Sequence, residues 1–304
     1  MTSSFLNIAR QGKNGWLRYV AGILLMFVSA IVVVAPVLIG SLLVSGNPLE
    51  TLEALEGQQF VSTLIDSNPV LGFGFMGLTG FALTVGLYLA VTRIHGRPFL
   101  TLVTPDTAIG WQRICQGFGL WLGLWALSFA LRYGISPASY RFSFNASEWL
   151  PLALLAILII PVIATLHVLF IYGYLFQGIG LLIRHPLILS MASALVWAGL
   201  AFDLEEPAWM MVNIPYAMFL FWVVIRDNRS ELVIGIAIAH QLINLLLVSF
   251  SESSFRSVPL FAADSLPSVG WSFLSLSLRA GIFYFVLLRS KPQSLNHQTH
   301  GNPT

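Results

Sequence analysis

The chain alternates between long apolar runs and short polar segments. Eight apolar runs can be traced, near residues 16–44, 70–92, 115–134, 149–182, 187–202, 208–225, 231–250 and 268–288. A helix needs about 20 mainly apolar residues to cross a bilayer. The pattern therefore predicts an all-α fold, a polytopic integral membrane helical bundle with about eight transmembrane helices. Pro151 and Pro161 predict a tilt or kink in the long fourth run.

The composition agrees with a lipid environment. Apolar residues make up 57% of the 304 positions and charged residues only 9%, whereas a soluble domain carries roughly 25% charged residues. Such a chain cannot cover a globular surface with polar groups, so the lipid bilayer is its expected solvent. The net charge of +2 gives no indication of nucleic-acid binding. The single cysteine, Cys115, excludes an internal disulfide and a multi-cysteine metal site.

Basic residues are distributed unevenly between alternate polar segments. If the N-terminus is cytoplasmic, the outer segments hold Arg132, Arg141 and Arg256, and the inner segments hold Arg10, Lys13, Arg18, Arg93, Arg97, Arg113, Arg184, Arg226, Arg229, Arg289 and Lys291. Basic residues accumulate on the cytoplasmic side of membrane proteins. We therefore expect a multi-pass protein of the plasma (inner) membrane with both termini cytoplasmic. Residues 1–289 form a single predicted membrane domain, and the polar segment 290–304 is a predicted disordered cytoplasmic tail.

Three stretches in the second half of the chain carry recognisable spacing. They are VIATLHVLFIYGYLFQGIGLLIRHP (162–186), SALVWAGLA (193–201) and RDNRSELVIGIAIAHQLINLLLVSF (226–250). Their order, spacing and small residues resemble the CPBP family of intramembrane metalloproteases, also called Abi or type II CAAX endopeptidases. The resemblance implies a CPBP-like core at about residues 150–250. The family motifs are Glu-Glu-x-x-Phe-Arg-Gly, Phe-x-x-x-His and His-x-x-x-Asn.

The resemblance also implies which residues occupy the motif positions. Without gaps, the motif-equivalent positions are His167 and Val168 for the Glu pair, Tyr172 for Arg, Ala201 for the first His, and Ala237 and Gln241 for the last motif. A literal His-x-x-x-Asn lies three residues later, at His240 and Asn244. The two registers, 237/241 and 240/244, both remain open.

These substitutions bear on the expected chemistry. Metal-dependent peptide hydrolysis needs a bound cation, an open coordination position and a base for water. Valine and alanine side chains can neither ligate metal nor move protons, so we expect no catalytic residue, no bound metal and no cofactor. If activity persists with altered ligands, His167, His240 and Asn244 are the catalytic candidates. Zinc is then the expected cofactor, with His167 and His240 as its ligands.

Ionisable residues inside a membrane are costly and therefore point to function. His167 and His240 are such residues, and each could instead be a neutral histidine that hydrogen-bonds a neighbouring helix. Arg279 lies near the middle of the last apolar run. It could tie its helix to a backbone carbonyl or line the path of an anion or substrate.

Three functions fit these observations. The first is a non-catalytic CPBP relative, a pseudoenzyme that binds a membrane peptide or another membrane protein. The second is an active membrane metalloendopeptidase with altered ligands. The third is a small transporter or permease component. The expected partners are the lipid bilayer and either a membrane peptide or another membrane protein, with no nucleic acid.

Overall fold

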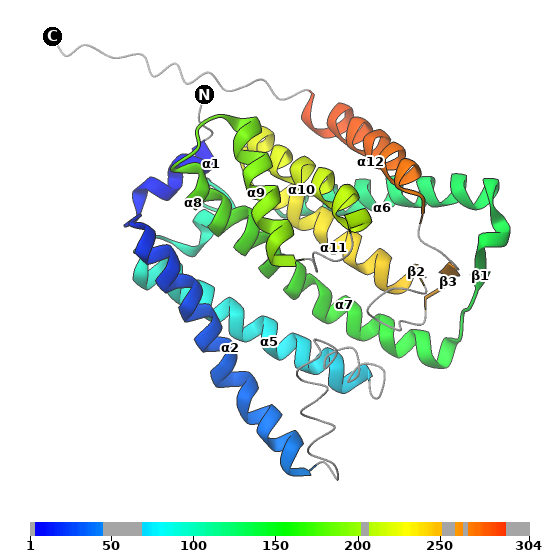
Figure 1. Cartoon of the computed structure of the whole chain (residues 1–304), viewed down its shortest axis with the longest axis horizontal. Helices are drawn as coiled ribbons and strands as arrows, with labels where there is room; N and C mark the ends of the chain where they lie inside the picture. Colours follow the sequence, from blue (N-terminus) through cyan, green and yellow to red (C-terminus); the bar gives the residue numbers. More distant parts are fainter. Residues whose placement is uncertain (1–3, 45–68, 202–206, 251–258, 264–266, 290–304) are drawn as a thin grey trace.

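The computed structural model describes residues 4–44, 69–201, 207–250, 259–263 and 267–289. These residues form a bundle of helices with one small sheet (Figure 1). The helices are α1 (Ser4–Asn7), α2 (Trp16–Val44), α5 (Pro69–Leu89), α6 (Trp111–Ile135), α7 (Ala146–Val168), α8 (Phe176–Gly180), α9 (Pro186–Ala201), α10 (Pro207–Asp227), α11 (Glu231–Leu246) and α12 (Val269–Phe283). The predicted helical bundle is confirmed. The predicted tail, 290–304, lies outside the described residues.

Five helical segments are long and apolar enough to cross a membrane. Among the described residues they are Trp16–Gly40, Val70–Ile94, Trp111–Ile135, Ala146–Gly180 and Val269–Leu288. The prediction of eight spans is therefore too high. Helices α9 and α11 contain 16 residues each, and a rise of 1.5 Å per residue makes each about 24 Å long. That length is less than the roughly 30 Å thickness of the hydrocarbon core.

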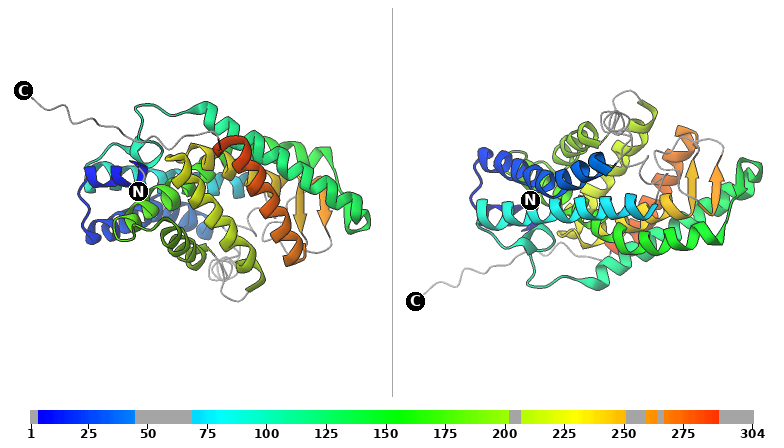
Figure 2. Two further views of the ribbon diagram at one scale, coloured as in Figure 1. Left: turned by 90° about the horizontal axis from the view of Figure 1, so that it is seen from above. Right: turned by 90° about the horizontal axis from the view of Figure 1, so that it is seen from below.

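A three-stranded sheet, which the apolar pattern did not predict, closes one end of the bundle. Strand β3 (Phe261–Ala263) pairs antiparallel with β1 (Tyr140–Phe142) and parallel with β2 (Val248–Phe250). The predicted helix over 231–250 is wrong at its end, because α11 stops at Leu246 and β2 follows. Rings from α6 cover the sheet, with Phe129 5.0 Å from the Phe261 ring. Figure 2 shows the strands at the opposite end from the N-terminal helix.

Two helix crossings depend on glycine. At the crossing of α6 and α11, a Cβ on Gly235 would lie 2.1 Å from the carbonyl oxygen of Ile114, and one on Gly117 would lie 2.3 Å from that of Leu232. At the crossing of α2 and α5, a Cβ on Gly86 would lie 2.6 Å from the Cα of Met26. Small residues let membrane helices approach closely, so these positions set the spacing of the bundle.

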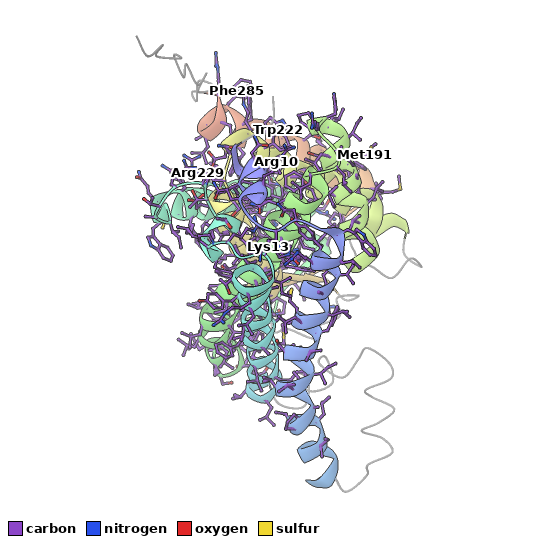
Figure 3. The ribbon with its side chains drawn as sticks, turned by 90° about the vertical axis from the view of Figure 1, so that its left-hand side faces the viewer. Arg10, Lys13, Met191, Trp222, Arg229 and Phe285 are labelled. Atoms are coloured by element: carbon purple, nitrogen blue, oxygen red, sulfur yellow. The ribbon has the colours of Figure 1, made fainter. Side chains whose placement is uncertain are left out.

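The end opposite the sheet is joined by a polar network. Phe5 N–H donates to the Asn228 side chain at 2.9 Å, and Ser230 N–H donates to the Val103 carbonyl at 2.8 Å. Arg113 forms a two-pronged ion pair with Asp227. Figure 3 shows this end, where Arg10, Lys13 and Arg229 are labelled. The network connects the N-terminal residues, the segment after α5 and the turn between α10 and α11, and we call it the basic-end network.

Candidate functional site

His167 lies in the last turn of α7 and is held by a neighbouring helix. The indole Nε1–H of Trp197 on α9 donates to His167 Nε2 at 3.1 Å, and the two rings meet edge to face. Indole nitrogen is only a donor, so His167 Nε2 must be the acceptor. In the neutral ring the proton then resides on Nδ1. The lone pair that a metal would need is therefore occupied by the Trp197 hydrogen bond.

The same histidine faces a groove on the side of the bundle. The groove has a volume of about 270 Å³. Its lining comes from α2, α5 and the region where α7 ends, and it consists of Ile23, Met26, Phe27, Leu83, Ile163, Leu166, His167 and Phe170. Helices α2, α5 and α7 lie side by side there (Figure 1). His167 is the only polar residue of this lining, so the groove combines an apolar wall with one imidazole.

A π-helical segment, Leu169–Leu175, follows directly after His167. π-helical turns inside α-helices occur frequently at functional sites. Tyr172 lies in this segment, buried, with its ring 4.5 Å from that of Phe221 on α10. The neighbouring motif position, Val168, belongs to the apolar core. The wide turn was not predicted from the sequence. Gly173 lets this turn pack closely on the segment after α5, because a Cβ there would lie 2.9 Å from the Leu102 carbonyl.

The second histidine lies on α11 and makes a different set of contacts. Asn244 Nδ2, one turn further along the helix, donates to His240 Nε2 at 3.3 Å. The His240 ring packs at 4.8 Å against that of Tyr216 on α10. Its Nδ1 is buried and has no hydrogen-bond partner among the described residues. The literal His-x-x-x-Asn sequence thus forms a real pair, although one within a single helix.

Arg279 of α12 joins this second group. Its guanidinium stacks over the Trp121 ring of α6 at 5.1 Å, and its Nε donates to the Ser275 carbonyl at 3.1 Å. The same Trp121 ring packs at 5.7 Å against the Tyr216 ring, which in turn packs on His240. The Ser275 carbonyl belongs to the arginine's own helix, so the hydrogen bond does not tie α12 to a neighbouring helix as predicted. Side chains from α6, α10, α11 and α12 meet here, and we call them the Arg279 cluster.

His167 and His240 pack against different tyrosines. The His167 and Tyr172 ring centroids are 6.4 Å apart, whereas His240 packs at 4.8 Å on Tyr216. In the described part of the chain, no three His, Cys, Asp or Glu side chains gather as a metal site would require. Of the other motif positions, Ala237 is buried and Gln241 is half-buried. The side chain of Ala201 lies outside the described set.

The carboxylate at the start of α11, in the last of the three motif stretches, belongs to the basic-end network. Glu231 begins α11 and is fully buried. It accepts a hydrogen bond from the Gly110 N–H at 3.2 Å and lies 3.9 Å from Arg229. Burial raises the pKa of its carboxyl above the ordinary value, against the Gly110 hydrogen bond and the Arg229 charge. Glu231 therefore has a structural position and lies apart from both histidine groups.

Comparison with known proteins gives one relative. No family model matches the chain, and no solved structure matches it. The chain is similar to a Bacillus subtilis (strain 168) protein named "Uncharacterized protein YyaK", with 29% identity over 182 residues. The aligned region covers 57% of this chain and 60% of that protein, so the chain spans less than two thirds of the relative's length. Together with the five apolar helices, this match makes the chain a multi-pass membrane helical protein related to YyaK.

Proposed function

We propose that this chain is a non-catalytic member of the CPBP family that binds a membrane-embedded peptide in the groove beside His167. The family assignment is supported by the three sequence stretches at 162–186, 193–201 and 226–250. The binding role is supported above all by one observation, the hydrogen bond from Trp197 to His167 Nε2.

That hydrogen bond opposes metal ligation. A metal at Nε2 would displace the Trp197 N–H and leave a buried donor without an acceptor, which costs about 1–3 kcal/mol. His240 has the same arrangement, since Asn244 Nδ2 donates to its Nε2. In both imidazoles Nδ1 then carries the proton and Nε2 is occupied, whereas zinc requires a lone pair.

The distribution of carboxylates also opposes hydrolysis. Within the five candidate spans the sequence contains one Asp or Glu, Glu148, which lies in the first turn of α7 at the sheet end. Glu231 is held at the basic end by Gly110 and Arg229. A general base has to lie within hydrogen-bond reach of the water that it activates. The described carboxylates therefore supply none beside either histidine.

The groove has the properties of a site for a peptide in lipid. Its wall is apolar, and His167 Nδ1 carries the proton that a peptide carbonyl or hydroxyl can accept. Interhelical hydrogen bonds of this kind hold membrane helices together. Helix α2, which forms one side, has only 11% of its span window buried. A second helix could therefore lie against it without displacing other parts of the bundle.

We also propose that both termini face the cytoplasm of the plasma membrane. Five helical segments are long enough to span alone, and between the fourth and fifth of them the shorter helix α11 runs from the basic end at Glu231 to the sheet at Val248, which returns the chain to the side from which the last span starts. The two described ends of the chain support a common side: Phe5 N–H donates to the Asn228 side chain at the end of α10, and Tyr284 packs at 5.5 Å on Trp222, also near the end of α10. Reporter fusions at Gly57 and Asn296 test this arrangement. They should report opposite compartments, and reports from the same compartment would exclude it.

Photo-crosslinking tests the binding role. A benzophenone amino acid replaces Phe27, which lines the groove, or Ile157 on α7, which does not. The two positions are equally open to lipid, with 59% and 57% of their surfaces exposed. In cells, Phe27 should give discrete peptide adducts that Ile157 does not give. Equal labelling at both positions would mean that the groove holds only lipid.

A cleavage assay tests the absence of hydrolysis. The purified protein in lipid nanodiscs is incubated with a panel of membrane peptides, with and without a chelator. We expect no chelator-sensitive cleavage. If cleavage occurs and both chelator and His167→Ala abolish it, the chain is an active metalloendopeptidase with altered ligands, and the non-catalytic proposal fails.

A further inference from the structure

The Arg279 cluster contains a cation at membrane depth for which the described residues provide no counter-ion. Arg279 is the eleventh residue of α12, near the middle of the span Val269–Leu288. The ion pairs of the described residues all lie at the basic end, between Arg113 and Asp227 and between Arg229 and its two carboxylates. An isolated charge in a low-dielectric region is costly unless it is paired.

The guanidinium is positioned but not saturated. Its Nε donates to the Ser275 carbonyl and its Nη2 faces the Ser275 hydroxyl at 3.4 Å. Its plane is supported by the Trp121 ring. Such a cation–π contact is stabilising, but it does not replace the hydration that a buried guanidinium loses. Nη1 donates no hydrogen bond within the described chain, so one edge of the guanidinium remains free.

Other donors surround that guanidinium. Tyr216 brings a phenol O–H to the same Trp121 ring that supports Arg279, with the two ring centroids 5.7 Å apart. His240 packs on the Tyr216 ring, and its buried Nδ1 has no hydrogen-bond partner among the described residues. Asn244, bonded to His240, is exposed at the bundle surface. The described residues thus bring one cation and neutral donors together, with access from the surface beside α11.

We propose that the Arg279 cluster binds the carboxylate of a long-chain amphiphile, of which a fatty acid is the simplest example. The free Nη1 edge of Arg279 and the Tyr216 hydroxyl are two donors, which match the two oxygens of one carboxylate. A phosphate monoester has more charge and more acceptor atoms than these donors satisfy. The apolar body of the ligand would lie along the lipid-facing side of α12, where Leu274 and Leu278 are exposed.

This site is separate from the groove of the proposed function. The groove belongs to α2, α5 and α7, whereas the cluster belongs to α6, α10, α11 and α12. A ligand at Arg279 therefore requires neither CPBP membership nor binding of a peptide. An experiment that excludes peptide binding in the groove would not exclude carboxylate binding at Arg279, and the reverse also holds.

The test measures retention of tritiated palmitate by the full chain in phosphatidylcholine nanodiscs. The variants are Arg279→Gln, Tyr216→Phe and Arg289→Gln. Arg289 is a matched control, because it lies just beyond the same helical span and also stacks on an aromatic ring, Phe285, at 5.6 Å. Competitors are methyl palmitate, which lacks the charge, butyrate, which lacks the long chain, and phosphatidylglycerol, which carries a phosphodiester.

We expect saturable binding that weakens at least about tenfold in Arg279→Gln and about tenfold in Tyr216→Phe, since each removes a hydrogen bond to a charged group. Arg289→Gln should bind like the unaltered chain, and only unlabelled palmitate should compete. Tyr216→Phe keeps the ring packing, so it reports on the site even if Arg279→Gln fails to fold. Unchanged binding in Tyr216→Phe, or competition by any of the other three compounds equal to that of palmitate, overturns the proposal.

Discussion

The basic-end network and the polar residues at membrane depth differ in how their polar side chains are hydrogen-bonded. At the basic end, Gln177 accepts a hydrogen bond from Arg97 at 2.6 Å and donates to the carbonyls of Thr101 and Phe5 at 2.8 and 3.2 Å. One buried amide thereby joins three segments far apart in the sequence. At membrane depth, Arg279 bonds within its own helix and keeps a free edge.

The difference indicates what each region does. Gln177 uses both its oxygen and its amide nitrogen within the protein, so it has no capacity left for a ligand and its role is to hold the fold together. By contrast, four polar side chains at membrane depth make few hydrogen bonds within the described chain, and each keeps an N–H or O–H donor. They are His167, Tyr216, His240 and Arg279. The first region should therefore control stability and the second should control binding. Mutations can separate the two.

The largest effect is expected for Gln177→Leu. The substitution leaves the buried Arg97 guanidinium without its acceptor and two carbonyls without their donor, so we expect a loss of about 3 kcal/mol in unfolding free energy. The control is Gln241→Leu, a half-buried glutamine of α11, which should change stability by less than about 0.5 kcal/mol. Denaturant titration in detergent measures both. Equal losses would remove the distinction between the two regions.

The next effect is expected at the ion pair of Arg113 with Asp227. The Asp227 side chain is fully buried and the Asp106 side chain, which pairs with Arg229, is 54% exposed. Asp227→Asn should lower the unfolding free energy by about 2 kcal/mol, because it leaves Arg113 without its charge partner. Asp106→Asn should cost about 0–0.5 kcal/mol, since solvent screens an exposed pair. A reversed order of the two values would contradict the assigned burial.

A smaller effect is expected at membrane depth for Trp197→Phe. The variant removes the indole N–H donated to His167 but keeps an aromatic ring, so we expect a loss of about 1 kcal/mol. Trp222→Phe, at a tryptophan that is 37% exposed, is the matched control and should be nearly neutral. Thermal unfolding in nanodiscs compares the two. If both are neutral, the Trp197–His167 hydrogen bond contributes little to holding the imidazole.

The smallest effect is a pH dependence at the basic end. His95 lies buried between the Lys13 carbonyl and the Tyr174 hydroxyl, both at 2.9 Å. Burial lowers its pKa below the ordinary value of 6.5, the Arg97 and Arg18 charges lower it further, and the Lys13 hydrogen bond opposes them. As the pH falls through 6.5, the unfolded chain binds more protons than the folded chain, so stability decreases.

We therefore expect the melting temperature to fall between pH 7.5 and pH 5.5, with part of that fall missing in His95→Gln. His185→Gln serves as a control, because His185 lies in the short connection before α9. An identical pH dependence in the unaltered chain and His95→Gln would show that His95 does not titrate in this range. If the melting temperature depended less on pH in His185→Gln but not in His95→Gln, the titrating group would be His185 and not His95.

The sequence predicted the class of fold correctly, but not the number of membrane spans or the end of the helix over 231–250. Apolar runs mark membrane helices because lipid imposes their composition, and the helical membrane bundle follows from that. The run 231–250 contains α11 and the strand β2, and apolarity alone does not distinguish them. Strand β2 forms only because β3, which follows later in the chain, pairs with it.

The site was predictable where its contacts are local. His240 and Asn244 are four residues apart, so a helix places them on one face. Trp197 and His167 are 30 residues apart, and their contact depends on how α7 and α9 pack. The π-helical turn at Leu169–Leu175 changes which residues face the interior on either side of it. An ungapped alignment of the family motif with His167 and Tyr172 assumes a regular α-helix, so it cannot predict which side chains the π-helical turn redirects.

The state of His167 tests the central claim most directly. Nitrogen-15 NMR of the imidazole, in protein labelled at histidine and titrated with Zn²⁺, reports the proton and the partner of each ring nitrogen. We predict a protonated Nδ1 and a hydrogen-bonded, unmetallated Nε2 that does not respond to zinc, with the His167 signals assigned by their loss in His167→Ala. A stoichiometric zinc-dependent shift of Nε2 that a chelator reverses would contradict it.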